Sequence, residues 1–233
     1  SFCIVPYTRG RERSRDFDSV ISELEGLAAA GYKEVMLLGQ NVNSYGKGSA
    51  DGKTFPDLLR AAAAIKGFSR IRFMSSHPKD ISDEVIEIMA SEPNIEKHLH
   101  LPLQSGSDRL LKIMNRPYDT EKYMHIVDNF RRLVPGGSIS TDIIVGFPGE
   151  TEEDFEGTMD IVRRAKFDSA FTFQYSIRPG TKAAEMEDQV PHDIVTERFG
   201  RLLKLQNDLV FESNKAKIGK VEEVLIEGLS STS

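Results

Sequence analysis

Hydrogen-bonding side chains follow the predicted strands at five places along the chain. Each of these segments comes directly after a stretch of strand length, and four of the five also contain a glycine: residues 39–45, 75–78, 104–107, 146–150 and 176–180. In α/β proteins the carboxyl ends of parallel strands form the edge at which ligands bind and react. A polar, glycine-rich composition is also ordinary for loops, but its recurrence after each predicted strand favours a ligand-binding edge.

Two of the predicted strands alternate polar and apolar residues, which gives each strand one polar face. The polar positions are His98, His100, Pro102 and Gln104 in residues 97–104, and Ser138, Ser140 and Asp142 in residues 138–145. A packed barrel core would be apolar and branched throughout, so polar inward faces indicate an open barrel with a ligand inside. We predict that the two histidines form hydrogen bonds in this lumen and do not bind a metal, because no third ligand is suitably spaced.

Helix-like and strand-like segments alternate from end to end. The sequence predicts strands at 34–38, 70–74, 97–104, 138–145 and 168–176, and helices at 18–30, 55–66, 82–90, 108–114, 120–133, 151–165 and 193–215. Repeated strand–helix units predict a parallel sheet with right-handed crossovers. The predicted class is therefore α/β, either as a barrel or as a doubly wound sheet.

Composition limits the remaining possibilities. The 233 residues suffice for one large α/β barrel or two smaller domains. The net charge of -6 argues weakly against a nucleic-acid partner, although binding footprints are local. Apolar runs are only strand-sized and no secretory signal is recognisable, so we expect a cytoplasmic protein without membrane contact. The single cysteine, Cys3, excludes an internal disulfide; taken alone, such a residue is ordinarily a small buried apolar group.

Several motifs together resemble one enzyme family. They are SFC at 1–3 with the arginine-rich segment behind it, LLGQNVNSYG at 37–46, HLHLPLQSGS at 98–107, MNR at 114–116 and DIIVGFPGET at 142–151. In this order and spacing they resemble the radical S-adenosylmethionine (radical SAM) tRNA methylthiotransferases, in the branch that acts on isopentenyl-adenosine. The resemblance covers nearly the whole chain. It implies a partial (β/α)6 TIM-like barrel that lacks its first strand.

The resemblance also implies an iron–sulfur cluster. In that family the cluster loop is Cys-x-x-x-Cys-x-x-Cys, and Cys3 matches its third cysteine. Three thiolates bind three irons of a [4Fe-4S] cluster, which leaves the fourth iron for S-adenosylmethionine. The family carries a second cluster on an N-terminal domain. Because only one cysteine is present here, we expect the chain as given to be inactive.

The cofactor-binding residues follow from the same resemblance. Gln40 and Asn41 would contact the amino group of the methionine moiety, and Arg116 would bind its carboxylate with a bidentate guanidinium. Arg116 could instead be a cation that interacts with a helix dipole.

Four further positions complete the implied cofactor site. Gln104 and Asp142 would hold the ribose hydroxyls. Gly146 and the backbone of residues 173–175, including Tyr175, would face the adenine. An inward carboxylate such as that of Asp142 needs a partner, which makes a purely structural role harder to explain.

Two terminal segments suggest contact with RNA. Alternating arginines near the start could contact tRNA phosphates or stack on a base, namely Arg9, Arg11, Arg13 and Arg15. An equally plausible reading is a solvated stretch neutralised by Glu12 and Asp16. Residues 217–228 switch to a period of two and resemble the opening strand of the small tRNA-binding β-barrel called TRAM. We therefore predict a radical SAM domain over 1–216 and the beginning of a second domain over 217–233.

The function implied is radical methylthiolation at C2 of N6-isopentenyladenosine next to the tRNA anticodon. The implied partners are that tRNA and an electron donor of flavodoxin or ferredoxin type, and the implied state is a monomer. Two alternatives stay open: the same chemistry on another tRNA base or a ribosomal protein, and a cluster-free binding protein. The Gln-Asn-Val-Asn run at 40–43 argues against the first alternative.

Overall fold

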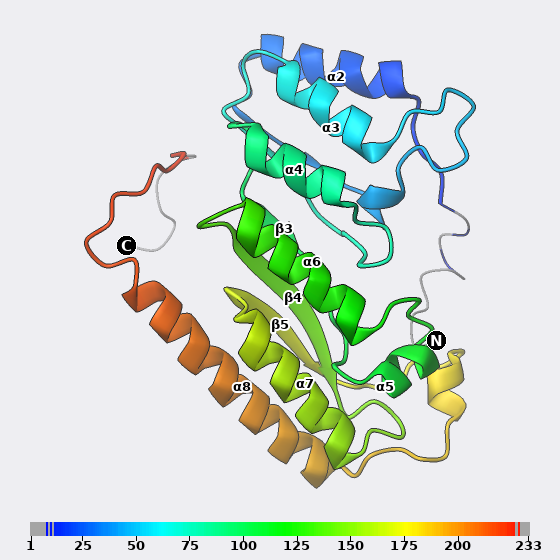
Figure 1. Ribbon diagram of the computed structural model, residues 1–233. Helices are drawn as coiled ribbons and strands as arrows, with labels where there is room; N and C mark the ends of the chain where they lie inside the picture. The colour runs from blue at the N-terminus through cyan, green and yellow to red at the C-terminus, as the bar shows by residue number, and fades with distance from the viewer. Residues whose placement is uncertain (1–7, 9, 11, 227, 229–233) are drawn as a thin grey trace.

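Strands and helices alternate along the chain, as the sequence predicts. The computed structural model describes residues 8, 10, 12–226 and 228 (Figure 1). The strands are β1 (Glu34–Leu37), β2 (Arg70–Phe73), β3 (His98–His100), β4 (Ser138–Val145) and β5 (Ser169–Gln174). The helices are α2 (Phe17–Ala29), α3 (Phe55–Ala64), α4 (Asp83–Ser91), α5 (Asp108–Ile113), α6 (Thr120–Leu133), α7 (Glu152–Ala165) and α8 (His192–Lys215), with 3₁₀ turns η1 (Val42–Ser44) and η2 (Lys182–Glu185).

All strand pairs are parallel, and the strands lie side by side in chain order. β1 pairs with β2, and β3, β4 and β5 form a second sheet. A bridge between Ile71 and Ile95 joins the two: the Ile71 N–H donates to the Asn94 carbonyl at 2.7 Å, and the Glu96 N–H donates to the Ile71 carbonyl at 2.9 Å. The predicted α/β class with parallel strands is therefore confirmed.

The long helices cover one side of the strands. α2, α3, α4, α6, α7 and α8 follow one another, each in contact with the next (Figure 1). The strand residues on this side, such as Ile71, Leu99 and Ile143, are fully buried in the main apolar core. In a doubly wound sheet, helices would cover both faces. The described elements do not have that arrangement, and the other face of the strands carries the polar residues predicted to point inward.

The third strand is shorter than predicted. We expected residues 97–104 to form one strand, but the ladder with β4 covers only His98–His100, with a single further bridge at Gln104. Pro102 has no N–H to donate to a ladder. The Leu103 N–H donates to the side-chain hydroxyl of Thr141 at 3.0 Å, and Gln104 has a φ of 67°. The chain therefore leaves the sheet early while it still follows β4.

Helix starts agree closely with the predicted caps. The Ser82 hydroxyl accepts a hydrogen bond from the Val85 N–H, and Thr151 with Asp154 forms the predicted capping box of α7.

Near the carboxyl end of the chain, the described residues 217–226 form no strand, and Val221 is 99% exposed. A β-strand needs a partner to form a ladder, so the start of a second barrel stays a prediction. Within the described residues, no helix combines the length and apolar character needed to cross a membrane.

Candidate functional site

The loops after β1 and β2 are tied to each other at the carboxyl edge of the strands. The Asn41 amide nitrogen Nδ2 donates to Asp80 Oδ2 at 2.6 Å, and the Val42 N–H donates to the Ser75 carbonyl at 3.2 Å. Lys47 Nζ lies 3.0 Å from the other Asp80 oxygen. Burial works to raise the pKa of Asp80, but hydrogen bonds from Lys47 and Asn41 outweigh it and lower that pKa. Asp80 is therefore a fixed anion that orients the Asn41 amide.

Several buried polar atoms at this edge lack a hydrogen-bond partner among the described residues. They are Oδ1 of Asn41, both amide atoms of Asn43, Oγ of Ser76 and Oη of Tyr175. Burying a polar atom without a partner costs free energy, so native structures pair nearly all of them. A polar ligand at the strand edge would supply the missing partners.

Arg116 reaches back to the loop after β2. Its Nη1 lies 3.1 Å from Nε2 of His77, whose ring stands edge-on to Tyr118 at 5.5 Å. Burial, with the nearby Arg116 charge, lowers the pKa of His77 to about 4. The Lys79 N–H also donates to the other His77 nitrogen at 3.2 Å, yet a neutral imidazole has only one acceptor nitrogen. Only one of the two hydrogen bonds can therefore form at a time.

Replacing His77 with glutamine should flatten part of the pH profile of stability. Between pH 6.5 and about 4 the unfolded chain binds a proton on His77 that the folded chain does not, so folded stability falls as pH decreases through this window. Glutamine keeps an acceptor for Arg116 and does not titrate. In thermal melts, the variant should gain stability relative to the parent below pH 6.5 and hold a constant difference above it. A difference that stays constant at all pH values would contradict the assignment.

The strands β3, β4 and β5 bring four predicted residues together in two pairs. The Gln104 N–H donates to the Asp142 carbonyl at 2.8 Å, and the Tyr175 N–H donates to the Val145 carbonyl at 2.8 Å. Gly146 lies between them with a φ of +76°, and a Cβ there would stand 2.4 Å from a methyl carbon of Val195. The structure therefore places Gln104 beside Asp142 and, farther along β4, Tyr175 beside Gly146, although the two members of each pair are far apart in the sequence.

The predicted polar face of β3 and β4 forms a connected array. Ser140 Oγ lies 2.8 Å from His98 Nε2 and 2.9 Å from His100 Nδ1. His100 Nε2 lies 3.5 Å from Asp142 Oδ2. Burial lowers the pKa of His98. The prediction that both histidines form hydrogen bonds in this face is confirmed.

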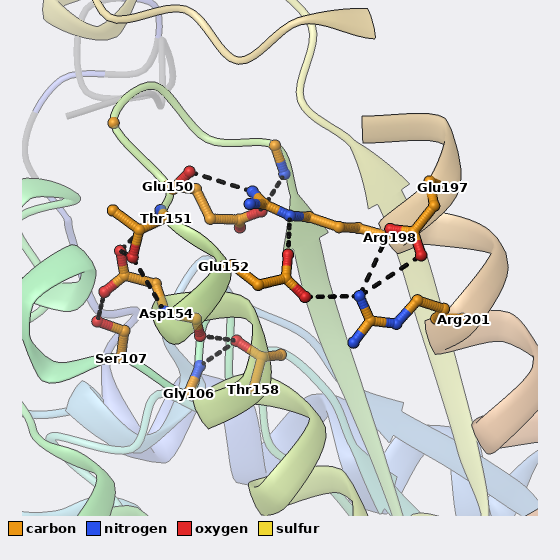
Figure 2. A network of polar contacts seen from close by, with 12 residues as sticks. Gly106, Ser107, Glu150, Thr151, Glu152, Asp154, Thr158, Glu197, Arg198 and Arg201 are labelled. Carbon is orange, nitrogen blue, oxygen red and sulfur yellow. Dashed lines mark hydrogen bonds and ion pairs between the residues drawn. The ribbon is translucent and has the colours of Figure 1, made fainter. Parts of the chain in front are cut away.

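A buried ion pair that the sequence analysis missed holds the loop after β4. Glu150 Oε1 accepts from the Gly146 N–H at 3.0 Å and from Arg198 Nη1 of helix α8 at 3.0 Å (Figure 2). The side chains of Arg198 and Glu150 are only 6% and 2% exposed. Burial raises the pKa of Glu150, although the Gly146 N–H and Arg198 work to lower it. No local pattern in the sequence pairs residues so far apart.

Asp154 joins the loop after β3 to helix α7. Its carboxylate accepts from the Ser107 hydroxyl at 2.5 Å and from the N–H and hydroxyl of Thr151 (Figure 2). It also accepts from the Arg109 guanidinium. Nearby, the Gly106 N–H donates to the Thr158 hydroxyl at 2.8 Å, and a Cβ on Gly106 would lie 2.5 Å from the Gly157 carbonyl oxygen. Position 106 must therefore be glycine for α7 to pack against the loop after β3.

The predictions near the amino terminus are only partly covered. Cys3, Arg9 and Arg11 lie outside the described residues. Within those residues, no group of three His, Cys, Asp or Glu side chains is arranged to hold a metal ion. Arg15 pairs with Glu23 at 2.5 Å, whereas Asp16, expected to neutralise the arginines, caps α2 through the Ser19 N–H.

A cavity of about 910 Å³ lies beside the exposed edge of β1. Arg13 and Arg15 line it together with Gln40 and Asn41. The structure thus brings two of the predicted cofactor-binding residues next to two of the predicted RNA-binding arginines.

The chain is similar in sequence to several known proteins. A sequence model described as the radical SAM superfamily matches residues 1–162. The chain is 54% identical over 230 residues to the tRNA-2-methylthio-N(6)-dimethylallyladenosine synthase of Clostridium botulinum, which covers 99% of this chain and 51% of that protein. The protein of the same name from Caldicellulosiruptor saccharolyticus is 56% identical over 230 residues, 99% of this chain and 49% of that protein. The chain thus spans about half the length of the curated relatives it matches.

Two solved structures share the fold at low sequence identity. Coproporphyrinogen III oxidase from Escherichia coli, described as a radical SAM enzyme, aligns with a TM-score of 0.59 and 15% identity over 83% of this chain and 46% of its own. Methylornithine synthase aligns with a TM-score of 0.54 and 16% identity over 88% of this chain and 58% of its own. At such identities the likeness concerns the fold alone.

Proposed function

Because this chain belongs to the radical SAM superfamily, we propose that it forms the radical-generating domain of an enzyme that methylthiolates a prenylated adenosine in tRNA. The observation that carries the proposal is the pairing of Gln104 with Asp142 and of Gly146 with Tyr175 along β3, β4 and β5, on a chain 54% identical to a protein named for that reaction. The reaction would add a methylthio group at C2 of N6-isopentenyladenosine next to the anticodon.

The polar atoms of the strand edge fit S-adenosylmethionine. Asn41 Oδ1 is buried without a partner among the described residues, and Asp80 holds the other amide atom, so Oδ1 is oriented to accept from an ammonium group. Gln40, exposed beside it, would contribute a second polar contact. Arg116 would bind the carboxylate in place of its contact with His77, which a neutral imidazole cannot maintain together with the Lys79 bond.

The nucleoside end of the same cofactor fits the neighbouring strands. Asp142 and Gln104 would hold the ribose hydroxyls, since a carboxylate accepts two such hydrogen bonds. The backbone at Gly146 would face the adenine, while its missing Cβ makes room for Val195 of α8. Tyr175 Oη, buried without a partner in the described part of the chain, would pair with the adenine. The Glu150–Arg198 pair would keep this loop in place through the Gly146 N–H.

The finer organisation is part of the proposal. Cys3 would supply one thiolate of a [4Fe-4S] cluster. Together the cluster and S-adenosylmethionine supply a carbon-centred radical that removes hydrogen from the substrate. We place the strands in a partial (β/α)6 barrel over residues 1–216, followed by the start of a TRAM barrel at 217–233. The proposal also includes a second cluster and an electron donor of flavodoxin or ferredoxin type. It further includes a monomeric state and a cytoplasmic location, with tRNA as the partner.

Expression of the complete gene product in a strain that lacks its own methylthiotransferase tests the proposal. Mass spectrometry of tRNA nucleosides should reveal the methylthio derivative of isopentenyl-adenosine, and Cys3→Ala should abolish it. Anaerobically reconstituted protein should bind iron and cleave S-adenosylmethionine when reduced. If cleavage occurs but the adenosine stays unmodified, the assigned substrate is wrong. If neither iron nor cleavage is found, the assignment of radical chemistry is wrong.

A further inference from the structure

Two phenylalanines stand exposed on the face of the strands opposite the helices. Phe171 and Phe173 of β5 are 54% and 53% exposed. The ladder with β4 places Phe171 beside Asp142 and Phe173 beside Ile144. The Phe171 ring also lies edge-on to His100, with the ring centroids 6.0 Å apart. The two rings therefore share the face that carries the polar array of β3 and β4.

The surroundings of these rings are mainly polar. Neighbouring positions on the same face are occupied by His98, His100, Ser140 and Asp142, and farther along by an ion-pair cluster of Glu34 with Arg70 and Arg72. Aromatic rings each bury a large apolar area when they find a partner. An apolar patch rimmed by polar residues is the usual mark of a binding site. The patch thus fits a small apolar group attached to a polar molecule.

We infer that Phe171 and Phe173 bind the dimethylallyl group of the substrate adenosine. The inference rests on the proposed function, in which the substrate is an RNA whose aliphatic chain is this five-carbon group. Such a group is uncharged and branched, so its transfer from water to an aromatic surface is favourable in free energy. Asp142, the ladder neighbour of Phe171, is assigned to the cofactor ribose. A prenylated adenosine held by these rings would therefore lie next to the cofactor.

The ratio of two RNA affinities tests the inference. The probes are an anticodon stem-loop that carries N6-dimethylallyladenosine and the same stem-loop with plain adenosine, and the protein is the complete reconstituted gene product. We expect the parent protein to prefer the prenylated RNA by roughly tenfold or more. The double variant Phe171→Ala with Phe173→Ala should reduce that ratio to near one, while Phe171→Leu should keep most of it. Phe211→Ala, which removes a ring 66% exposed on α8, is the matched control.

The outcomes separate this inference from the proposed function. If the parent makes the methylthio product and the double variant keeps the full preference, the prenyl site lies elsewhere. If the double variant binds both RNAs more weakly by the same factor, the rings stack on the base or support the fold, and the inference is wrong. A loss of S-adenosylhomocysteine binding in the double variant would reassign the rings to the cofactor. If the parent shows neither preference nor product, the proposed function fails and the prenyl site falls with it.

Discussion

Replacing Arg198 with methionine should destabilise the protein by about 3–5 kcal/mol, because it leaves a buried carboxylate without its counter-charge. Arg198 donates to the side chain of Glu150 at 3.0 Å and to its backbone carbonyl at 3.1 Å, and both side chains are almost fully buried. Glu150 also accepts from the Gly146 N–H. Loss of the guanidinium should therefore loosen the loop after β4 as well as the packing of α8.

The pH dependence of this variant distinguishes lost charge pairing from lost packing. Burial already raises the pKa of Glu150, and removal of Arg198 should raise it further. An acid whose folded pKa exceeds its unfolded pKa binds more protons in the folded state, so stability decreases as pH rises through the folded pKa. The deficit of Arg198→Met should accordingly be full above the folded Glu150 pKa of the variant and shrink as pH falls below it toward the folded Glu150 pKa of the parent. Chemical denaturation at several pH values measures this.

Two companion variants provide the controls. Adding Glu150→Gln to Arg198→Met should restore much of the lost stability, because the buried charge is then absent. Arg201→Met, one turn along α8, removes pairs with the more exposed Glu152, Glu156 and Glu197 and should cost no more than about 1 kcal/mol. If Arg198→Met and Arg201→Met lose equal stability, the buried pair has no special role.

Replacing Asp142 with alanine should weaken the binding of S-adenosylhomocysteine, a stable relative of the proposed cofactor, by about 100-fold, or about 2.7 kcal/mol. In the proposed site this carboxylate accepts hydrogen bonds from the ribose hydroxyls, and hydrogen bonds to a charged group are worth about 1.5–3 kcal/mol. Asp142→Asn keeps the shape and one acceptor, so we expect an intermediate loss. Calorimetry on reconstituted protein measures these affinities.

Asp160→Ala is the matched control for this prediction. Asp160 is an exposed carboxylate of α7 paired with Arg164, and its loss should leave the affinity unchanged. Because the Asp142 side chain is part exposed, its replacement should also change thermal stability little. An unchanged affinity in Asp142→Ala would limit the role of this residue to its contact with His100 and would remove it from the proposed cofactor site.

Local signals were enough to predict most elements. α6 and β4 have the bounds that the sequence predicts, since helix caps and residue periodicity act over a few neighbouring positions. The joint role of Gln104 and Asp142 came from the family resemblance, and in the structure the Gln104 N–H donates to the Asp142 carbonyl. β3 is the exception, since Pro102 removes a donor from its ladder.

By itself, therefore, the sequence determined the order of elements, their caps, the parallel strands and the edge at which polar residues gather. Only the tertiary structure decided which distant side chains meet. Arg198 pairs with Glu150 because α8 packs beside α7, and a helical period carries no information about that partner. β5 alternates Phe171 and Phe173 with Ala170 and Thr172, which are not strongly polar, so its pattern leaves open which face the helices cover. Packing of the helices onto one side exposed the two rings, because burial depends on what the rest of the chain places against each face.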